Sequence, residues 1–245
     1  MAGERRQRVL SRLIGDEGSP FETKHLCALS ADLAGVSGAG ILLITNDSVQ
    51  GSVCSTSSDI AALEQLQYTL GEGPAIDAYR LDLPVLEPDV VHTQPPRWLA
   101  FTDPVIDAGF GAVFGFPLRV GGARFGALSL YRNEAGPLND EQHADTLVMA
   151  DIAAQAILVL QSTATPGHLA VELEVGSDYQ YVVHQASGMV AAQLEMSVGH
   201  ALMRLRAHAF AHDRFLPDVA REVVGRRLRF DPVTGNHVDQ IEPLD

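Results

Sequence analysis

A chain of 245 residues with 46% hydrophobic and 20% charged residues is long enough for one large and one small domain, and its composition excludes an intrinsically disordered protein. No stretch approaches the roughly 20 apolar residues of a membrane span, and the basic start is followed by no apolar run, so we expect a cytoplasmic protein without a membrane partner. The net charge of -14 by itself argues against nucleic-acid binding.

The charge is unevenly distributed along the chain. Segment 179–230 holds seven arginines and four acidic residues, a net charge of +3, whereas the remainder carries -17. One segment can therefore meet a polyanion while the rest keeps the chain soluble. A solvated helical face is the plain alternative explanation of the same arginines.

The sequence contains two cysteines, Cys27 and Cys54. In the expected cytoplasmic compartment thiols stay reduced, so the sequence predicts no structural disulfide. The default interpretation is that both are small, buried apolar residues. A redox-sensing thiol is the alternative, and it would require a lowered thiol pKa and solvent access.

Hydrophobic periodicity in the first two thirds of the chain predicts alternating helices and strands. In chain order, the predicted elements are a helix over 22–36, strands over 40–45 and 50–55, a helix over 57–70, a short strand around 85–86 and a helix over 98–108. Two long apolar strands, 111–120 and 123–132, then flank a Gly121-Gly122 hairpin turn, and a long helix follows over 140–161. The order predicts an α+β fold in which helices cover an antiparallel sheet.

Five aromatic residues gather in the predicted helix and hairpin of this region: Trp98, Phe101, Phe114, Phe116 and Tyr131. We expect them to line part of a small-molecule pocket on one side of the sheet, because ligand pockets are mostly apolar and aromatic. Ordinary core packing is the alternative for each residue, since large aromatic side chains dominate protein cores.

Beyond the predicted α+β part, 20–161, the segment 162–178 begins with the run STATPG and is predicted to be a linker. The period then becomes purely helical over 179–230. The pattern predicts three amphipathic helices: one over 179–194, a second capped by Ser197, and a third that has Pro217 near its start and carries its apolar stripe through Leu228. The tail after Asp231 is predicted to be loose.

The sequence offers no convincing catalytic or metal-binding motif. The glycine clusters at 38–40 and 109–111 precede strands, whereas a dinucleotide fingerprint leaves a strand and opens a helix. His208 and His212 can share a helix face, but zinc needs further ligands and none stands at motif spacing. We therefore expect a protein that is not an enzyme and has neither a metal nor a bound cofactor.

The C-terminal residues resemble a known family. The run Tyr181-Val-Val-His-Gln-Ala-Ser-Gly-Met-Val190, with 197–201, Leu205-Arg206 and Val219-Ala220, resembles the ANTAR domain, a bacterial RNA-binding module of transcription antitermination regulators. The upstream part resembles a GAF domain in its 70–74, 84–86 and 116–118 segments and its two-glycine hairpin. The arrangement is similar to that of actinobacterial GAF and ANTAR regulators. It departs from the pattern at Ser187, where the family usually has a basic residue, and at Ala75, where close relatives often have cysteine.

The resemblance implies that the C-terminal bundle binds nascent RNA carrying two hairpins with hexanucleotide loops, and thereby prevents the terminator hairpin. The residues expected to bind RNA are Ala186, Gly188, Arg204, Arg206, Arg214, Arg221 and Arg226. Arg206 would contact a phosphate or stack on a splayed base. A small-molecule signal of unknown identity in the GAF-like part would control this binding.

The long helix over 140–161 carries more apolar positions than one sheet-facing stripe requires, so the sequence predicts a homodimer through this helix and the helix over 22–36. The bundle folding back over the same face is the alternative. Two other function classes stay open. The chain could be a helix-turn-helix DNA-binding regulator, or a ligand-binding sensor whose C-terminal bundle only mediates dimerisation.

Overall fold

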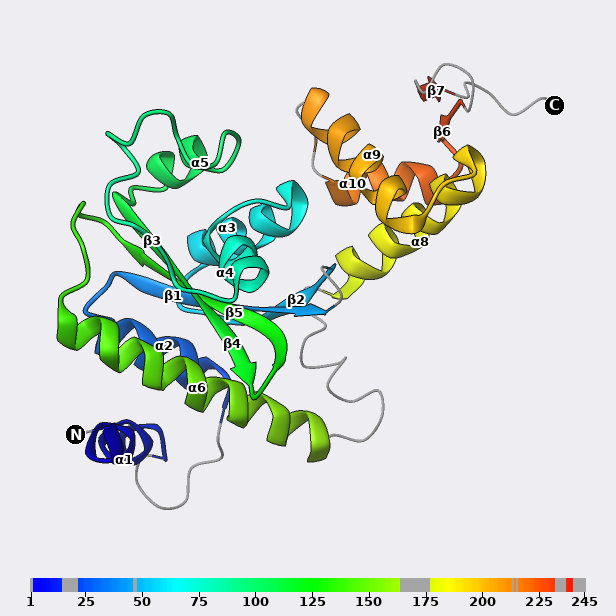
Figure 1. Cartoon of the computed structure of the whole chain (residues 1–245). Helices are drawn as coiled ribbons and strands as arrows, with labels where there is room; N and C mark the ends of the chain where they lie inside the picture. Colours follow the sequence, from blue (N-terminus) through cyan, green and yellow to red (C-terminus); the bar gives the residue numbers. More distant parts are fainter. Residues whose placement is uncertain are drawn as a thin grey trace. The chain divides into compact units, whose positions relative to one another are not determined.

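The computed structural model describes residues 2–14, 22–45, 48–163, 177–212, 214, 216–231 and 237–239. The chain divides into two compact units, Met1–Leu169 and Ala170–Asp245. The first unit contains a sheet with helices and the second is mainly helical (Figure 1). Most of the predicted linker 162–178 lies outside the described residues.

The first unit is built on a five-stranded antiparallel sheet with the strand order β2-β1-β5-β4-β3. The strands are β1 (Gly38–Thr45), β2 (Ser48–Ser55), β3 (Val85–Glu87), β4 (Ala112–Val120) and β5 (Ala123–Arg132). The predicted hairpin turn joins β4 to β5, and Gly121 there has a φ of 59°, a left-handed conformation that glycine adopts without a steric penalty. The predicted α+β fold with an antiparallel sheet is confirmed.

Helices cover both faces of this sheet, as Figure 1 shows. Helices α2 (Lys24–Ala34) and α6 (Asp140–Thr163) cover one face, and α3 (Ser58–Leu70) and α4 (Pro74–Leu81) cover the other. The short α5 (Thr102–Asp107) precedes β4. A Cβ at Gly115 would collide with Pro74 of α4, whereas the next residue, Phe116, packs against His143 of α6. Neighbouring residues of β4 therefore point to opposite faces of the sheet, as expected for a strand.

The basic N-terminal residues form a helix, α1 (Ala2–Ile14), which the sequence did not predict. Val9 and Leu13, one turn apart, bury their side chains, while Arg8 forms an ion pair of 2.7 Å with Asp145 of α6. Arg5 also pairs with Asp145. Part of the apolar surplus of α6 is therefore covered by α1 of the same chain, which weakens the sequence argument for a dimer.

Helix α6 still exposes apolar side chains, with Leu147 44%, Leu158 37% and Val159 61% exposed. Contrary to the expectation that no stretch approaches a membrane span, its segment Asp140–Leu160 is long and apolar enough to cross one by length and composition alone. The helix packs against β4, α2 and α1. It therefore has a place in the core of this unit.

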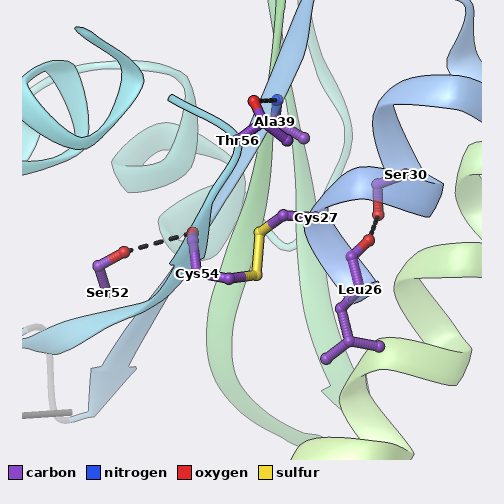
Figure 2. The surroundings of a disulfide bond; sticks show 7 residues. All are labelled: Leu26, Cys27, Ser30, Ala39, Ser52, Cys54 and Thr56. Atoms are coloured by element: carbon purple, nitrogen blue, oxygen red, sulfur yellow. Dashed lines mark hydrogen bonds between the residues drawn. A yellow bond between two sulfur atoms is a disulfide. The ribbon is translucent and has the colours of Figure 1, made fainter. Parts of the chain in front are cut away.

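A disulfide joins Cys27 of α2 to Cys54 of β2, with their Cα atoms 6.0 Å apart (Figure 2). The prediction of two reduced thiols is wrong, which excludes a redox-sensing free thiol, but both cysteines are buried as the default interpretation expected. Cys54 lies opposite Ile41 on the sheet and faces α2, so the bond ties the edge strand β2 to the helical layer on that face. The cross-link closes a loop of 27 residues in sequence that contains all of β1.

The second unit contains, among its described residues, the helices α8 (Ser177–Leu194), α9 (Val198–Ala211) and α10 (Leu216–Val224), which contact one another. Alanine, valine and leucine side chains form its core: Val183, Ala186, Ala201, Leu205, Ala209, Val219, Ala220 and Val223. Ser197 caps α9, as predicted, by accepting a hydrogen bond from the N–H of His200.

The third helix is shorter than predicted. It ends at Val224, and Leu228 belongs instead to a strand, β6 (Leu228–Phe230), that pairs with β7 (His237–Asp239). The Gly225-Arg226 turn separates the two elements, and Leu228 and Phe230 point inward from the strand. An apolar residue four positions after Val224 fits helical spacing, which is why the sequence alone extended the helix.

Candidate functional site

A cluster of polar side chains is buried in the first unit, between α3 and β5. Glu64 and Gln67 come from α3, and Ser129 and Tyr131 from β5, and none of the four is exposed. The Tyr131 hydroxyl donates a hydrogen bond of 2.7 Å to Oε1 of Glu64. Nε2 of Gln67 lies 3.0–3.2 Å from Glu64, Ser129 and Tyr131. The four side chains thus form one connected network.

Two glycines make room for this buried polar cluster. A Cβ at Gly40 of β1 would lie 2.7–2.9 Å from the Glu64 side chain, and a Cβ at Gly73 would lie 2.5 Å from Oε1 of Gln67. The same Gln67 oxygen accepts a 2.8 Å hydrogen bond from the N–H of Ala75, in the first turn of α4. The segment that ends α3 and begins α4 is therefore fixed directly over the cluster.

Burial raises the pKa of Glu64 to about 7, although hydrogen bonds from Tyr131, Ser129 and Gln67 favour its charged form. The other carboxyl oxygen, Oε2, is buried and has no hydrogen-bond partner among the described residues. An unsatisfied oxygen of this kind is rare in protein interiors. Near neutral pH the carboxyl can therefore exchange a proton or accept a hydrogen bond from a donor group.

The polar cluster was not predicted from the sequence, although α3 carries a signal for it. Glu64 and Gln67 follow Ile60 and Leu63 at helical spacing, on the stripe that faces the sheet. Polar residues on a buried stripe need internal partners. Those partners lie more than 60 residues away, on β5, and the α3 pattern does not identify them.

The structure does not gather the five predicted aromatic residues around one pocket. Phe114 and Phe116 face α6, whereas Tyr131 faces α3 on the opposite side of the sheet. Trp98 and Phe101 pack edge to face, with ring centroids 6.0 Å apart. All five are buried in the core, which matches the packing alternative, and only Tyr131 belongs to the polar cluster.

The arginines expected to bind RNA differ in their surroundings. Arg204, Arg221 and Arg226 are exposed, whereas Arg206 and Arg214 are half-buried. Arg214 donates two hydrogen bonds of 2.7 and 2.8 Å to Glu222, and this pairing lowers the pKa of the carboxyl. Arg221 pairs with Asp218 one turn away. Arg227 and Arg229, which are not among the arginines expected to bind RNA, are also exposed.

The small residues expected at the RNA interface occupy two different environments. Ala186 has no exposed surface and packs in the helical core, where its small side chain allows the helices to approach closely. Gly188 is exposed, and a Cβ there would meet open space. Ser187 is buried and donates a 2.7 Å hydrogen bond to the carbonyl of Val183. Its position points inward and offers no phosphate contact.

The described residues contain no group of three or more histidine, cysteine or acidic side chains suited to a metal ion. His208 and His212, the pair considered from the sequence, have ring centroids 4.2 Å apart. Nδ1 of His212 lies 2.8 Å from the carbonyl oxygen of His208. This nitrogen is thereby engaged within the helix.

The family model of the GAF domain matches residues 23–158, which include the sheet, the polar cluster and both cysteines. No curated protein matches the sequence. Similar solved structures include the GAF domain of a phosphoenolpyruvate-protein phosphotransferase from Coxiella burnetii, with 11% identity, 66% of this chain and 95% of that chain covered, and a TM-score of 0.48. The second GAF domain of DevS from Mycobacterium smegmatis has 18% identity, coverages of 57% and 93%, and a TM-score of 0.42.

Proposed function

The chain belongs to the GAF domain family, a family of signal-sensing domains, and from this membership we propose that it is a regulator whose GAF domain controls an RNA-binding, ANTAR-like C-terminal unit. In this proposal the C-terminal unit holds nascent RNA in a two-hairpin form and so promotes transcription antitermination in the cytoplasm. The protein catalyses no reaction and acts through binding alone.

The observation that carries the proposal is the separation of charge between the two parts of the chain. The segment 179–230 has a net charge of +3 in a chain of -14. Arg204, Arg226 and Arg229 are exposed and have no ion pair with any described residue. Exposed cations without acidic neighbours keep their charge available for phosphates.

Exposed aromatic residues on the C-terminal unit favour RNA as its ligand over a polyanion that has no bases. Tyr181 of α8 is 73% exposed and Phe210 of α9 is 67% exposed. Proteins recognise single-stranded RNA loops by stacking unpaired bases on aromatic rings and guanidinium planes. Two such exposed rings on the unit that also carries the exposed arginines suit the hexanucleotide loops that the resemblance implies.

The signal enters this proposal through the buried polar cluster of the GAF domain. Glu64 offers an oxygen without a partner, and Gln67 links the carboxyl to the start of α4. A small molecule with a hydrogen-bond donor, placed at Glu64, would change the hydrogen bonds that fix α4. The proposal leaves the identity of this molecule open.

A homodimer is part of the proposal because two bundles on one assembly can bind two hairpins at high effective concentration. The exposed Leu147, Leu158 and Val159 of α6 are the residues we assign to the dimer contact. Light scattering on the full chain at micromolar concentration should give the mass of a dimer. A monomeric protein that binds two-hairpin RNA with full affinity would contradict the proposed homodimer.

The decisive experiment measures affinity by fluorescence anisotropy for a two-hairpin RNA, a single hairpin and duplex DNA of equal length, at several salt concentrations. We expect preference for the two-hairpin RNA, and Arg204→Ala should weaken it by about 1–3 kcal/mol. Arg119→Ala serves as the control, because it removes an exposed arginine of the GAF domain that pairs with Asp82 at 3.2 Å. Preference for the duplex would favour the helix-turn-helix alternative, and a dimer that binds neither would favour dimerisation alone.

A further inference from the structure

A pocket opens on the surface of the C-terminal unit, at the junction of α8, the turn after α10 and β6. It encloses about 270 Å³ and is lined by Met189, Gln193, Arg226, Leu228 and Arg229. Ligand pockets usually measure about 300–1,000 Å³, so this one suits a single small planar group better than a large cofactor. The arginines at its edge favour an anionic ligand.

The pocket combines apolar and polar groups in the way that a nucleotide requires. Met189 and Leu228 supply apolar surface, and the exposed Arg226 and Arg229 supply two cations without an ion pair among the described residues. The side chain of Gln193 is held in place because its Oε1 accepts a 3.0 Å hydrogen bond from the N–H of Phe230. Its amide nitrogen remains as a donor for a base edge.

The backbone presents Arg226 in an unusual conformation. The N–H of Arg227 donates to the carbonyl of Glu222 at 2.8 Å, and the N–H of Arg226 donates to that of Val223 at 3.0 Å, the bonding pattern of a Schellman C-cap. Glycine usually occupies the left-handed position of this motif, yet here Arg226 does, with a φ of 58°. A non-glycine residue in this region costs about 1–2 kcal/mol. An arginine that carries this cost at the edge of a pocket indicates a role in binding.

We propose that this pocket receives one unstacked base of bound RNA, with the base against Met189 and Leu228 and its phosphate between Arg226 and Arg229. The inference rests on the proposed RNA-binding function and adds a base-recognition site to it. Guanidinium groups can stack on a splayed base as well as contact phosphate. The pocket therefore selects the nucleotide at one loop position.

The first test uses Arg226→Gly in the full chain. Glycine relieves the left-handed strain, so this variant should be at least as stable as the wild type while binding two-hairpin RNA about tenfold more weakly. Arg229→Ala should show a similar loss. The matched control is Arg227→Ala, which removes the neighbouring exposed charge but does not line the pocket, and it should change the affinity by less than about twofold. Equal losses for all three variants would overturn the pocket and leave RNA binding standing.

The second test observes the Met189 methyl group by NMR in protein with 13C-labelled methionine methyl groups. Nucleoside monophosphates and two-hairpin RNA should each shift this resonance, because an aromatic base lies against it, whereas inorganic phosphate should not. An equal shift with phosphate would reduce the pocket to an anion site and overturn base recognition. A response to nucleotides in a protein that binds no RNA would keep the pocket and overturn the proposed function.

Discussion

The GAF domain and the C-terminal unit keep their polar groups in opposite places. In the GAF domain Glu64, Gln67, Ser129 and Tyr131 are enclosed without exposed surface. In the C-terminal unit the described core is apolar apart from Ser187, and the arginines lie exposed or half-buried. The GAF domain thus keeps its polar groups inside its core, and the C-terminal unit keeps its charged groups at the surface, where the proposed RNA partner would meet them.

The two parts also differ in how they are held together. The GAF domain has a five-stranded sheet with helices on both faces and a disulfide between α2 and β2. The C-terminal unit has helices that pack through small and medium apolar side chains. Since the units are separate and compact, we expect two unfolding transitions that substitutions can move independently.

The largest expected effect is in the C-terminal unit. Leu205 of α9 is fully buried, so Leu205→Ala should lower the free energy of unfolding of this unit by about 3–5 kcal/mol through the cavity it leaves. Urea unfolding monitored by circular dichroism should show the transition of the C-terminal unit at a lower urea concentration and the transition of the GAF domain unchanged. The control is Met203→Ala on the same helix, which is 56% exposed and should change stability by less than about 0.5 kcal/mol. A shift of both transitions by Leu205→Ala would contradict the independence of the units.

The disulfide should give the next effect, confined to the GAF domain. Cross-linking residues 27 positions apart restricts the unfolded chain, and Cys27→Ser with Cys54→Ser should cost about 3–4 kcal/mol. The same loss should appear when dithiothreitol reduces the wild-type protein, which controls for the substitutions themselves. If dithiothreitol left the unfolding transition of the wild-type GAF domain unchanged, the disulfide would not stabilise this domain.

The pH dependence of the GAF domain should follow Glu64. Its pKa rises from 4.5 to about 7 on folding, so the folded state holds the proton more tightly than the unfolded state. Stability from this group is present below pH 4.5 and is lost as the pH rises to 7, by about 3 kcal/mol in total. Between pH 5 and 8, the free energy of unfolding of the wild-type GAF domain should decrease more with rising pH than that of the Glu64→Gln variant. Parallel curves for the two proteins would contradict the raised pKa.

The smallest expected effect compares two serine helix caps whose hydrogen bonds have the same length. Ser57 accepts a hydrogen bond of 3.3 Å from the N–H of Ile60 in the GAF domain, and Ser197 accepts one of 3.3 Å from the N–H of His200 in the C-terminal unit. Ser57→Ala and Ser197→Ala should each cost about 1 kcal/mol, each in its own transition. Thermal unfolding of the two variants would check this. A loss confined to one of them would show that the caps are not equivalent.

Much of the fold could be predicted from the sequence because hydrophobic period and turn residues are local. The Gly121-Gly122 hairpin, the capped helix that ends at Gly71 and the helix capped by Ser197 all carry their signal within a few residues. The helix α1 escaped notice because only Val9 and Leu13 mark its buried face among charged residues.

The candidate sites were harder to predict because their members meet only in the folded chain. The Cys27–Cys54 bond and the contact of Gln67 with Tyr131 join distant residues, so no local pattern reveals them. The aromatic residues on β4 and β5 were grouped by proximity in sequence, but strand register places Phe116 and Tyr131 on opposite faces. Reduced thiols were expected because the cytoplasm is reducing, whereas the fold places Cys27 and Cys54 close enough to bond.

The close approach of Gly40 to Glu64 links two positions that lie 24 residues apart in sequence but in contact in the folded domain. A methyl group at position 40 would overlap the Glu64 side chain, so the sizes of the residues at positions 40 and 64 constrain each other. Among relatives with this fold, any side chain larger than glycine at position 40 should be accompanied by a shorter residue at position 64. Those sequences would then lack the buried acid, and a pairwise covariation of the two alignment columns would separate family members that contain it from those that do not.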